Sequence, residues 1–247
     1  MFARTALAAV VATSVTVSAP PPVTTFGTMR QLVRERDAAP KVVLADVLKQ
    51  PHAHGLGSIS GLRGEIAIVD GTAWLSYPPA AAGVAPKVVA SNDSREQAGF
   101  LVATHVDPAQ WRRIAVGEAL SAENLEAVLG KLVAQHGLSA TDIPFRIDGK
   151  FSTLTLAIVD GRKLPPGATS PEAMKQANHL QTETGVDATL VGFFAAKSDE
   201  RFTHPGTRVH VHAVVPSRRA TGHARAFSVA PGATLWLPAH GARAPAP

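Results

Sequence analysis

The sequence predicts an α+β fold that is predominantly β, arranged as two packed β-sheet lobes with a few helices. Three observations predict it. A chain of 247 residues with 45% hydrophobic residues is long enough to bury a substantial core. Its 20 glycines and 19 prolines imply many turns, and therefore short strands rather than long helices. Only one long stretch has the periodicity of an amphipathic helix.

That helix is expected over residues 122–136. Ser121 can cap its start and Gly137 can end it. Shorter helices are expected at Thr28 to Val33, where Thr28 is the cap, and at Val43 to Leu48. The long helix is identified by apolar residues at i, i+3, i+4, i+7 and i+8, namely Leu125, Val128, Leu129, Leu132 and Val133.

Strand patterns fill much of the remaining chain. Residues 64–71 form an apolar run that ends in Asp70-Gly71, which is a strong strand-to-turn signal, and a partner strand is expected from Thr72. A loop rich in proline and glycine is expected over residues 160–171. Further strands are expected over residues 145–149, 151–159 and 188–194.

Residues 208–215 alternate along the chain in the manner of a strand. Successive side chains on a strand point to opposite faces, so His210 and His212 project from the same side. Taken alone, a His-x-His pair on a strand is more often a solvated face than a metal site.

A third histidine changes that balance. Residues 216–222 have the composition of a turn, and residues 224–229 resume a strand pattern. In an antiparallel hairpin centred near Ser217, His223 lies opposite His212, where cross-strand β-carbons are about 5 Å apart. The spacing therefore predicts a metal site on a C-terminal β-hairpin. Three protein ligands with one open position are typical of catalytic zinc.

Composition excludes several other classes of function. The net charge of +5 and the pI of 9.9 come from scattered basic residues, and only 5% of residues are aromatic, so nucleic-acid binding is not expected. With no cysteine, the chain has no disulfides or thiolate ligands, and a transition metal depends on histidine and carboxylate groups.

The N-terminus resembles an export signal. Arg4 precedes an uncharged run from Thr5 to Ala19, which is too short for a membrane span but suits the apolar core of a signal peptide. The expected organisation is a signal peptide and spacer over residues 1–22, one domain over 23–238 and a disordered tail over 239–247. A cytoplasmic protein with a disordered leader is the alternative.

Two blocks resemble the alpha-acetolactate decarboxylase family, and the similarity extends from Phe26 to Phe227. The first block is Gly55 to Ile66, which matches in its glycines and its glutamate. The second resembles the zinc-binding signature of the family and comprises Thr189 to Phe194, Pro205-Gly206, His210, His212 and Gly222-His223.

The resemblance implies a zinc enzyme that converts 2-acetolactate, or a related 2-hydroxy-3-oxo acid, to acetoin and carbon dioxide. It implies His210, His212 and His223 as metal ligands, Glu65 as proton donor or as the group that orients it, and Ser58 as a substrate-binding residue. Without the resemblance, Glu65 is an exposed strand-end carboxylate and Ser58 an ordinary loop serine. A homodimer is compatible with the sequence.

Two departures from the family pattern favour an alternative function. Where the family has a carboxylate-binding arginine, this chain has Ala157 or a close neighbour, and Arg146 and Arg162 are candidate substitutes whose reach the sequence leaves open. No acid follows Phe227, whereas the family often supplies a glutamate from its tail. The alternative is an exported protein that binds zinc and a small molecule with weak or no decarboxylase activity.

Two further alternatives stay open. His204 is either a loop residue, which we favour, or an auxiliary ligand. A cupin-type metal oxygenase also begins with His-x-His, but such proteins usually place a glutamate soon afterwards, and residues 214–220 contain no carboxylate.

Overall fold

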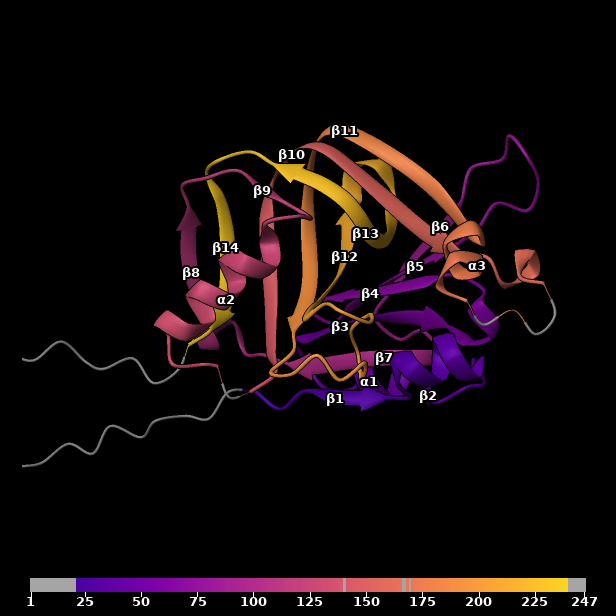
Figure 1. Cartoon of the computed structure of the whole chain (residues 1–247), viewed down its shortest axis with the longest axis horizontal. Helices are drawn as coiled ribbons and strands as arrows, with labels where there is room; N and C mark the ends of the chain where they lie inside the picture. The colour runs from indigo at the N-terminus through magenta and orange to yellow at the C-terminus, as the bar shows by residue number, and fades with distance from the viewer. Residues whose placement is uncertain (1–20, 140, 166–167, 169, 240–247) are drawn as a thin grey trace, which may run out of the picture.

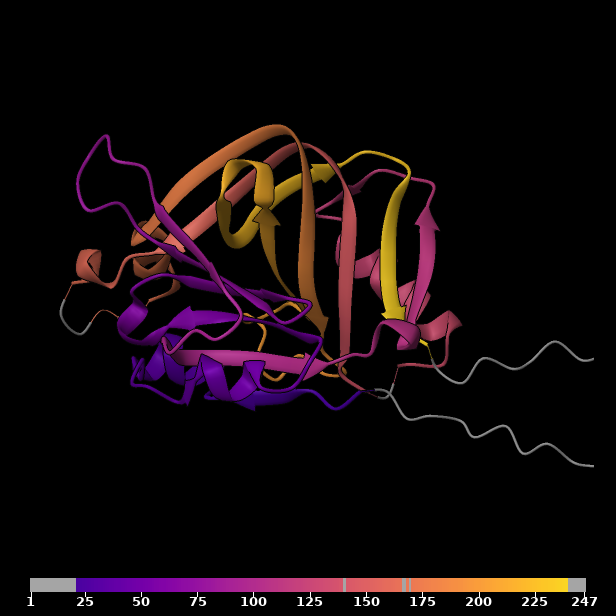
Figure 2. The same ribbon diagram turned by 180° about the vertical axis from the view of Figure 1, so that it is seen from behind.

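The computed structural model describes residues 21–139, 141–165, 168 and 170–239. Two seven-stranded antiparallel sheets dominate them, and few helices are present (Figures 1 and 2). The predicted fold class, α+β and predominantly β with two packed lobes, is confirmed. The predicted signal peptide and disordered tail lie almost wholly outside the described residues.

The first sheet comes from the N-terminal half of the chain. It has the order β1-β7-β3-β4-β5-β6, and β2 pairs with β7. The strands β4 and β5 confirm the predicted hairpin, because Asp70 and Gly71 both adopt positive φ in the turn between them. The strands are β1 (Thr24–Phe26), β2 (Val42–Val43), β3 (Ala53–Ile59), β4 (Glu65–Val69), β5 (Thr72–Tyr77), β6 (Lys87–Ser91) and β7 (Gln97–His105).

The second sheet has the order β8-β14-β10-β11-β12-β13-β9. An additional β10–β13 pairing makes β10, β11, β12 and β13 a closed circuit of strands. In Figure 1, β10 and β11 form a long arch beside β12 and β13. The strands are β8 (Trp111–Val116), β9 (Leu120–Ser121), β10 (Ile143–Val159), β11 (Asn178–Phe194), β12 (Val209–Val215), β13 (Ala220–Val229) and β14 (Ala233–Pro238).

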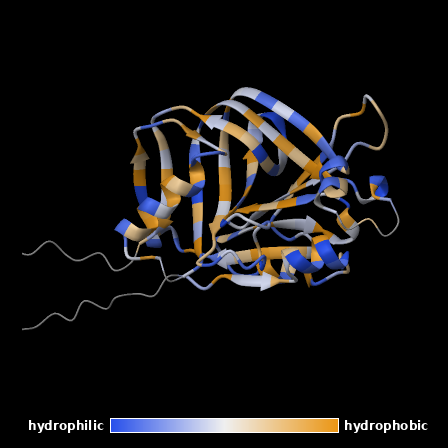
Figure 3. Cartoon of the chain, in the orientation of Figure 1, coloured by the Kyte–Doolittle hydropathy of each residue, from blue (hydrophilic) through white to orange (hydrophobic). Residues whose placement is uncertain are grey.

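The separate strands expected over residues 145–149 and 151–159 are wrong, because β10 is continuous over 17 residues. Its pairing with β11 continues across Gly149, so that glycine does not interrupt the strand. Figure 3 shows hydrophobic and hydrophilic residues alternating along β10 and β11, as expected for strands with one face on the core.

The helices lie at the edges of the sheets. α2 confirms the predicted long helix, and its Leu125, Leu129 and Val133 pack into the core of the second sheet. Ser121 is not its N-cap, because the helix begins at Leu125, three residues after the predicted start at residue 122, and Asn124 precedes it. The helical segments are η1 (Gln31–Glu35), α1 (Leu44–Leu48), η2 (Ser60–Leu62), η3 (Pro108–Gln110), α2 (Leu125–Gln135), η4 (Gly161–Lys163), α3 (Pro171–Gln176) and η5 (Pro216–Arg218).

Apolar side chains hold the two sheets together. Ala67 of β4 packs against Val191 of β11 and Val214 of β12. A larger cluster combines Leu56 and Phe100 of the first sheet with residues of the second. Since burial of apolar surface is the main favourable term in folding, these contacts fix the gap between the sheets where the functional residues lie.

None of the helices in the described part of the chain is both long and apolar enough to cross a membrane.

Gly64 positions the start of β4. Its φ is +146°, and a β-carbon placed there would lie 1.9 Å from the carbonyl oxygen of Ser76. We expect Gly64→Ala to lower the free energy of unfolding by about 3 kcal/mol or more, through steric overlap and an unfavourable φ. Gly232→Ala is the matched control, because Gly232 has φ +93° and open space around it, and about 1 kcal/mol is expected. Denaturant midpoints at unchanged m-value measure both, and equal losses would contradict the steric account.

Candidate metal centre

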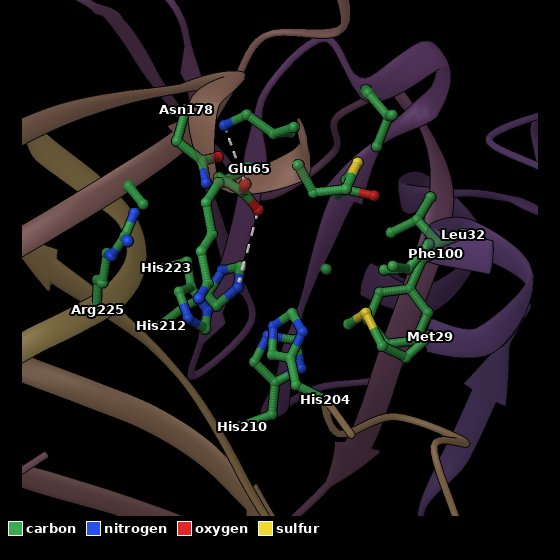
Figure 4. Close-up of a pocket in the computed structure, with 18 of the residues that line it drawn as sticks. Met29, Leu32, Glu65, Phe100, Asn178, His204, His210, His212, His223 and Arg225 are labelled. Carbon is green, nitrogen blue, oxygen red and sulfur yellow. Dashed lines mark hydrogen bonds and ion pairs between the residues drawn. The ribbon is translucent and has the colours of Figure 1, made fainter. Parts of the chain in front are cut away.

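A cavity of about 440 Å³ lies between the two sheets. Its lining comes from β3, β4 and β7 on one side and from β10, β11 and β13 with β12 on the other. The helical segments η1 and α3 complete the wall. Figure 4 shows the labelled residues that point into this space.

Three histidines converge in the cavity from the predicted hairpin. His212 on β12 is paired directly with His223 on β13, and η5 forms the turn, so the predicted register is confirmed. His210 lies two residues before His212 on the same face of β12. The centroids of the three rings are separated by 5.1 to 5.5 Å.

His204 is a fourth member of the cluster, although the favoured prediction treated it only as a loop residue. It lies on the connection between β11 and β12, and its ring centroid is 5.1 Å from that of His210 and 5.3 Å from that of His223. One nitrogen from each of His204, His210 and His223 can be chosen so that all three lie within 4.8 Å of one another. The prediction missed this contact because the loop between residues 195 and 208 gives no periodic signal.

The histidines of the cluster are in the neutral form that can bind a cation. Burial lowers the pKa of His204, and it lowers the pKa values of His210, His212 and His223 well below their usual range, so the rings are neutral near pH 7. His210 Nδ1 lies 2.7 Å from the carbonyl oxygen of Phe202, to which it donates, and this leaves the lone pair on Nε2. Neutral imidazoles oriented in this way are the form that binds divalent metals, so the donor set fits a transition metal ion.

Glu65 begins β4 and is buried beside the histidines. Its Oε1 accepts a hydrogen bond of 3.1 Å from the backbone N–H of Val159, and its Oε2 lies 3.8 Å from His212 Nε2. Burial raises the pKa of Glu65 to about 8, while the Val159 hydrogen bond opposes that rise. A nearby cation would favour the carboxylate and lower this pKa. Glu65 is therefore a buried cavity residue rather than an exposed strand end.

Ser58 faces the same cavity from the neighbouring strand. It is the direct cross-strand partner of Glu65, and its side chain is buried. Its Oγ has no hydrogen-bond partner within the described residues. Because an unpaired buried hydroxyl is costly, Ser58 is suited to bind a polar atom of a ligand.

The two arginines expected near the site are not there. Arg146 forms an ion pair of 2.9 Å with Asp148 and lies over the ring of Trp236, and Arg162 forms an ion pair of 2.7 Å with Asp160. Neither arginine lines the cavity. The predicted substitutes for a carboxylate-binding arginine are therefore wrong.

Arg225 lines the cavity instead. It lies two residues after His223 and is the extra residue of a β-bulge, because Ala224 pairs with Leu156 and Ala226 with Thr155. Bulges commonly re-aim side chains near functional sites. Within the described part of the chain, Arg225 forms no ion pair. The spacing His223-x-Arg225 could have revealed it, since i and i+2 share a face of a strand.

The opposite side of the cavity is apolar. Met29 and Leu32 come from the η1 region, and Phe100 comes from β7 (Figure 4). The ring of Phe100 is stacked on that of His210 with centroids 6.1 Å apart and an interplanar angle of 11°. The apolar wall therefore begins directly beside the histidine cluster.

Comparisons with known proteins identify the family and the fold. The family model described as alpha-acetolactate decarboxylase matches residues 24–240. No curated protein sequence matches this chain significantly.

Three solved structures share its fold. The alpha-acetolactate decarboxylase of Bacillus subtilis strain 168 is 18% identical with a TM-score of 0.67, and the match covers 87% of this chain and 84% of that one. The acetolactate decarboxylase of Bacillus subtilis subspecies spizizenii is 19% identical with a TM-score of 0.66, covering 87% and 85%. A Staphylococcus aureus protein of unknown function, similar to alpha-acetolactate decarboxylase, is 15% identical with a TM-score of 0.66, covering 87% and 84%.

At these identities the solved structures establish only the fold, whereas the family model extends over most of the sequence. The chain belongs to the alpha-acetolactate decarboxylase family.

Proposed function

We propose that this protein is a zinc-dependent decarboxylase that converts 2-acetolactate, or a related 2-hydroxy-3-oxo acid, to acetoin and carbon dioxide. The observation that carries the proposal is a cluster of neutral histidines beside a buried carboxyl group in the cavity between the two sheets. Membership of the family supports the class of reaction.

The reaction needs stabilisation of negative charge. When carbon dioxide leaves C2, the electron pair of the broken bond is delocalised onto the oxygen of the adjacent ketone. Bound zinc would supply Lewis-acid stabilisation of that oxygen. The chain's own residues hold the ion, orient the substrate and return a proton to the carbon.

We assign the permanent ligands to His210, His212 and His223. All three lie on β12 and β13, whose backbones are fixed by pairing within the sheet. His204 lies on a connecting segment next to exposed Pro205 and Gly206. We therefore propose that a zinc ion would be held by the three strand histidines, and that His204 is the residue that could make room for a substrate.

Glu65 is proposed to hand a proton to the carbon that loses carbon dioxide. Its Oε1 is fixed by the Val159 N–H, which leaves Oε2 as the atom facing the histidines and the cavity. Ser58 Oγ is proposed to hydrogen-bond a substrate oxygen, because it lies opposite Glu65 on the adjacent strand. Arg225 is proposed to bind the substrate carboxylate, because carboxylate–guanidinium hydrogen bonds are charge-assisted.

A specific observation favours the alternative, an exported protein that binds zinc and a small molecule without efficient turnover. The three histidines whose nitrogens lie within 4.8 Å of one another include His204, with His212 close by, and a set closed by all four imidazoles would be typical of structural zinc. Purified, zinc-loaded protein discriminates the two functions. Acetoin and carbon dioxide released from acetolactate above the spontaneous rate support the decarboxylase, and their absence with retained stoichiometric zinc favours the binding protein.

Removal of His212 and of His204 should have different effects on the metal. We expect His212→Ala to weaken zinc binding by more than the roughly 10- to 100-fold that loss of an outer-sphere partner costs, because a ligand is lost. His204→Ala should retain stoichiometric zinc. Competition with a chromogenic chelator measures both affinities. Loss of zinc in His204→Ala with full retention in His212→Ala would reject our assignment.

Glu65→Gln should retain zinc and lose turnover. Glutamine keeps the size of the side chain but supplies no acidic proton, so acetoin formation should fall by about 10²- to 10⁴-fold. Metal content and steady-state acetoin formation are measured on the same preparation, with exposed Glu123→Gln as the control. Unchanged turnover in Glu65→Gln would reduce this residue to a structural role.

Arg225→Gln should lower kcat/KM for acetolactate by about 10- to 100-fold, because a charge-assisted hydrogen bond is lost. Arg95→Gln is the control, since Arg95 is exposed and does not line the cavity. Steady-state kinetics over a range of substrate concentrations provide the test. Equal kinetic constants for the two variants would exclude a role for Arg225 in binding the carboxylate.

A further inference from the structure

We propose that the cavity selects 2-hydroxy-3-oxo acids whose substituent is apolar and longer than the methyl group of acetolactate. The substituent would pack on the wall formed by Met29, Leu32, Phe100 and Met174, while the carboxylate faces Arg225. This inference rests on the proposed decarboxylase function and specifies the substrate class for the same site.

The size of the cavity is the first argument. Its volume is about 440 Å³. Pockets of roughly 300–1,000 Å³ typically enclose drug-sized ligands. Acetolactate carries only methyl groups beside its polar atoms and is much smaller. A substrate that filled this cavity would need additional atoms.

The two sides of the cavity specify the chemistry of those atoms. Figure 4 shows Arg225 and Asn178 on one side of the histidines and Met29, Leu32 and Phe100 on the other. Glu65 is the one acid among the described lining residues, and it lies with the histidines. The side chains of Met29, Leu32 and Phe100 offer no polar group to a second polar end of a ligand. Lys175 follows Met174 on α3 and lines the cavity as well, but it is exposed.

Hydrogen bonds fix the segment that carries the apolar wall. The η1 region that carries Met29 and Leu32 is capped by Thr28, whose Oγ1 accepts a hydrogen bond of 3.0 Å from the Gln31 N–H. The Met29 N–H donates to the carbonyl oxygen of Arg201 at 2.9 Å. These contacts attach the wall to the same loop that carries His204.

Methionine gives the wall its capacity to adapt. The chain has three methionines, and two of them, Met29 and Met174, line this cavity. Methionine has an unbranched, flexible side chain that adjusts to irregular apolar surfaces. Substituents of different lengths can therefore be accommodated by changes in side-chain conformation.

The apolar wall lies directly beside the proposed metal ligands. Because Phe100 is stacked on His210, the apolar surface starts at the metal ligands themselves. A substrate bound near the histidines with its carboxylate toward Arg225 would direct its substituent toward Phe100 and the methionines. The chain length of the substituent should therefore control binding.

The experiment uses the zinc-loaded full chain and two ligand series. The first comprises 2-hydroxy-3-oxobutanoates with methyl, propyl or pentyl groups at C2, assayed by carbon dioxide release. The second comprises 2-hydroxybutanoate, 2-hydroxyhexanoate and 2-hydroxyoctanoate, which lack the 3-oxo group and are assayed by calorimetric binding. We expect kcat/KM and affinity to rise about fourfold for each methylene that is buried.

A variant that fills the wall tests its location. Met174→Trp should abolish the gain with chain length, whereas Gln176→Trp, on the exposed side of the same helix, should preserve both the gain and the turnover of the methyl substrate. Leu32→Phe provides a second filling variant if Met174→Trp does not fold. Thermal unfolding verifies each variant.

The outcomes separate the two proposals. If acetolactate is turned over but neither series favours longer chains, the decarboxylase stands and the inference is overturned. If affinity rises with chain length in the second series while no 3-oxo acid loses carbon dioxide, the proposed function is rejected and the selection for apolar substituents is retained. If neither binding nor turnover is detected, both are overturned.

Discussion

The antiparallel pairing of β12 with β13 is the constraint on which the site depends. It sets His212 directly opposite His223, and the pairing of β13 with β10 then places His223 opposite Ala157. The closed circuit of four strands leaves the register little freedom, because a slip by one residue would turn every histidine to the other face. The core of the second sheet supports the donor geometry by opposing such a slip.

The cavity brings together buried polar groups that satisfy few of one another's hydrogen-bonding and charge requirements. Burial keeps the histidines neutral and disfavours the charged form of Glu65. Arg225 supplies a positive charge at the rim, where solvent still reaches it. A divalent cation with an organic anion would satisfy the lone pairs, the unpaired Ser58 hydroxyl and the guanidinium together. The polar groups therefore match a ligand and not one another.

Local patterns in the sequence predicted the parts of the site that depend on neighbouring residues. The alternation around His210 and His212, with a turn before His223, was sufficient to predict the hairpin and its register. Glu65 and Ser58 were identified by resemblance, and the pairing of β3 with β4 places them opposite each other.

Contacts that depend on distant segments could not be predicted in the same way. His204 enters the cluster because its loop is anchored by buried Phe202, which packs against Phe193, and no local pattern encodes that contact. The long strand β10 was predicted in two pieces, because polar residues in its exposed middle interrupt the apolar pattern. Only the buried end of β11, residues 188–194, was predicted, because its first half is polar and largely exposed. Arg146 was expected near the site from position alone, whereas Asp148 and Trp236 hold it elsewhere.

Because of the bulge at Arg225, the length of β13 can change by one residue without a change in the side chains that it packs into the core. Ala224 faces the core before the bulge, and Phe227 and Val229 face it afterwards, so alternation resumes with its phase shifted by one residue. A strand shortened by one residue here would keep the same three side chains inside. Deletion of this single amino acid would thus remove the guanidinium from the mouth of the cavity without repacking the interior.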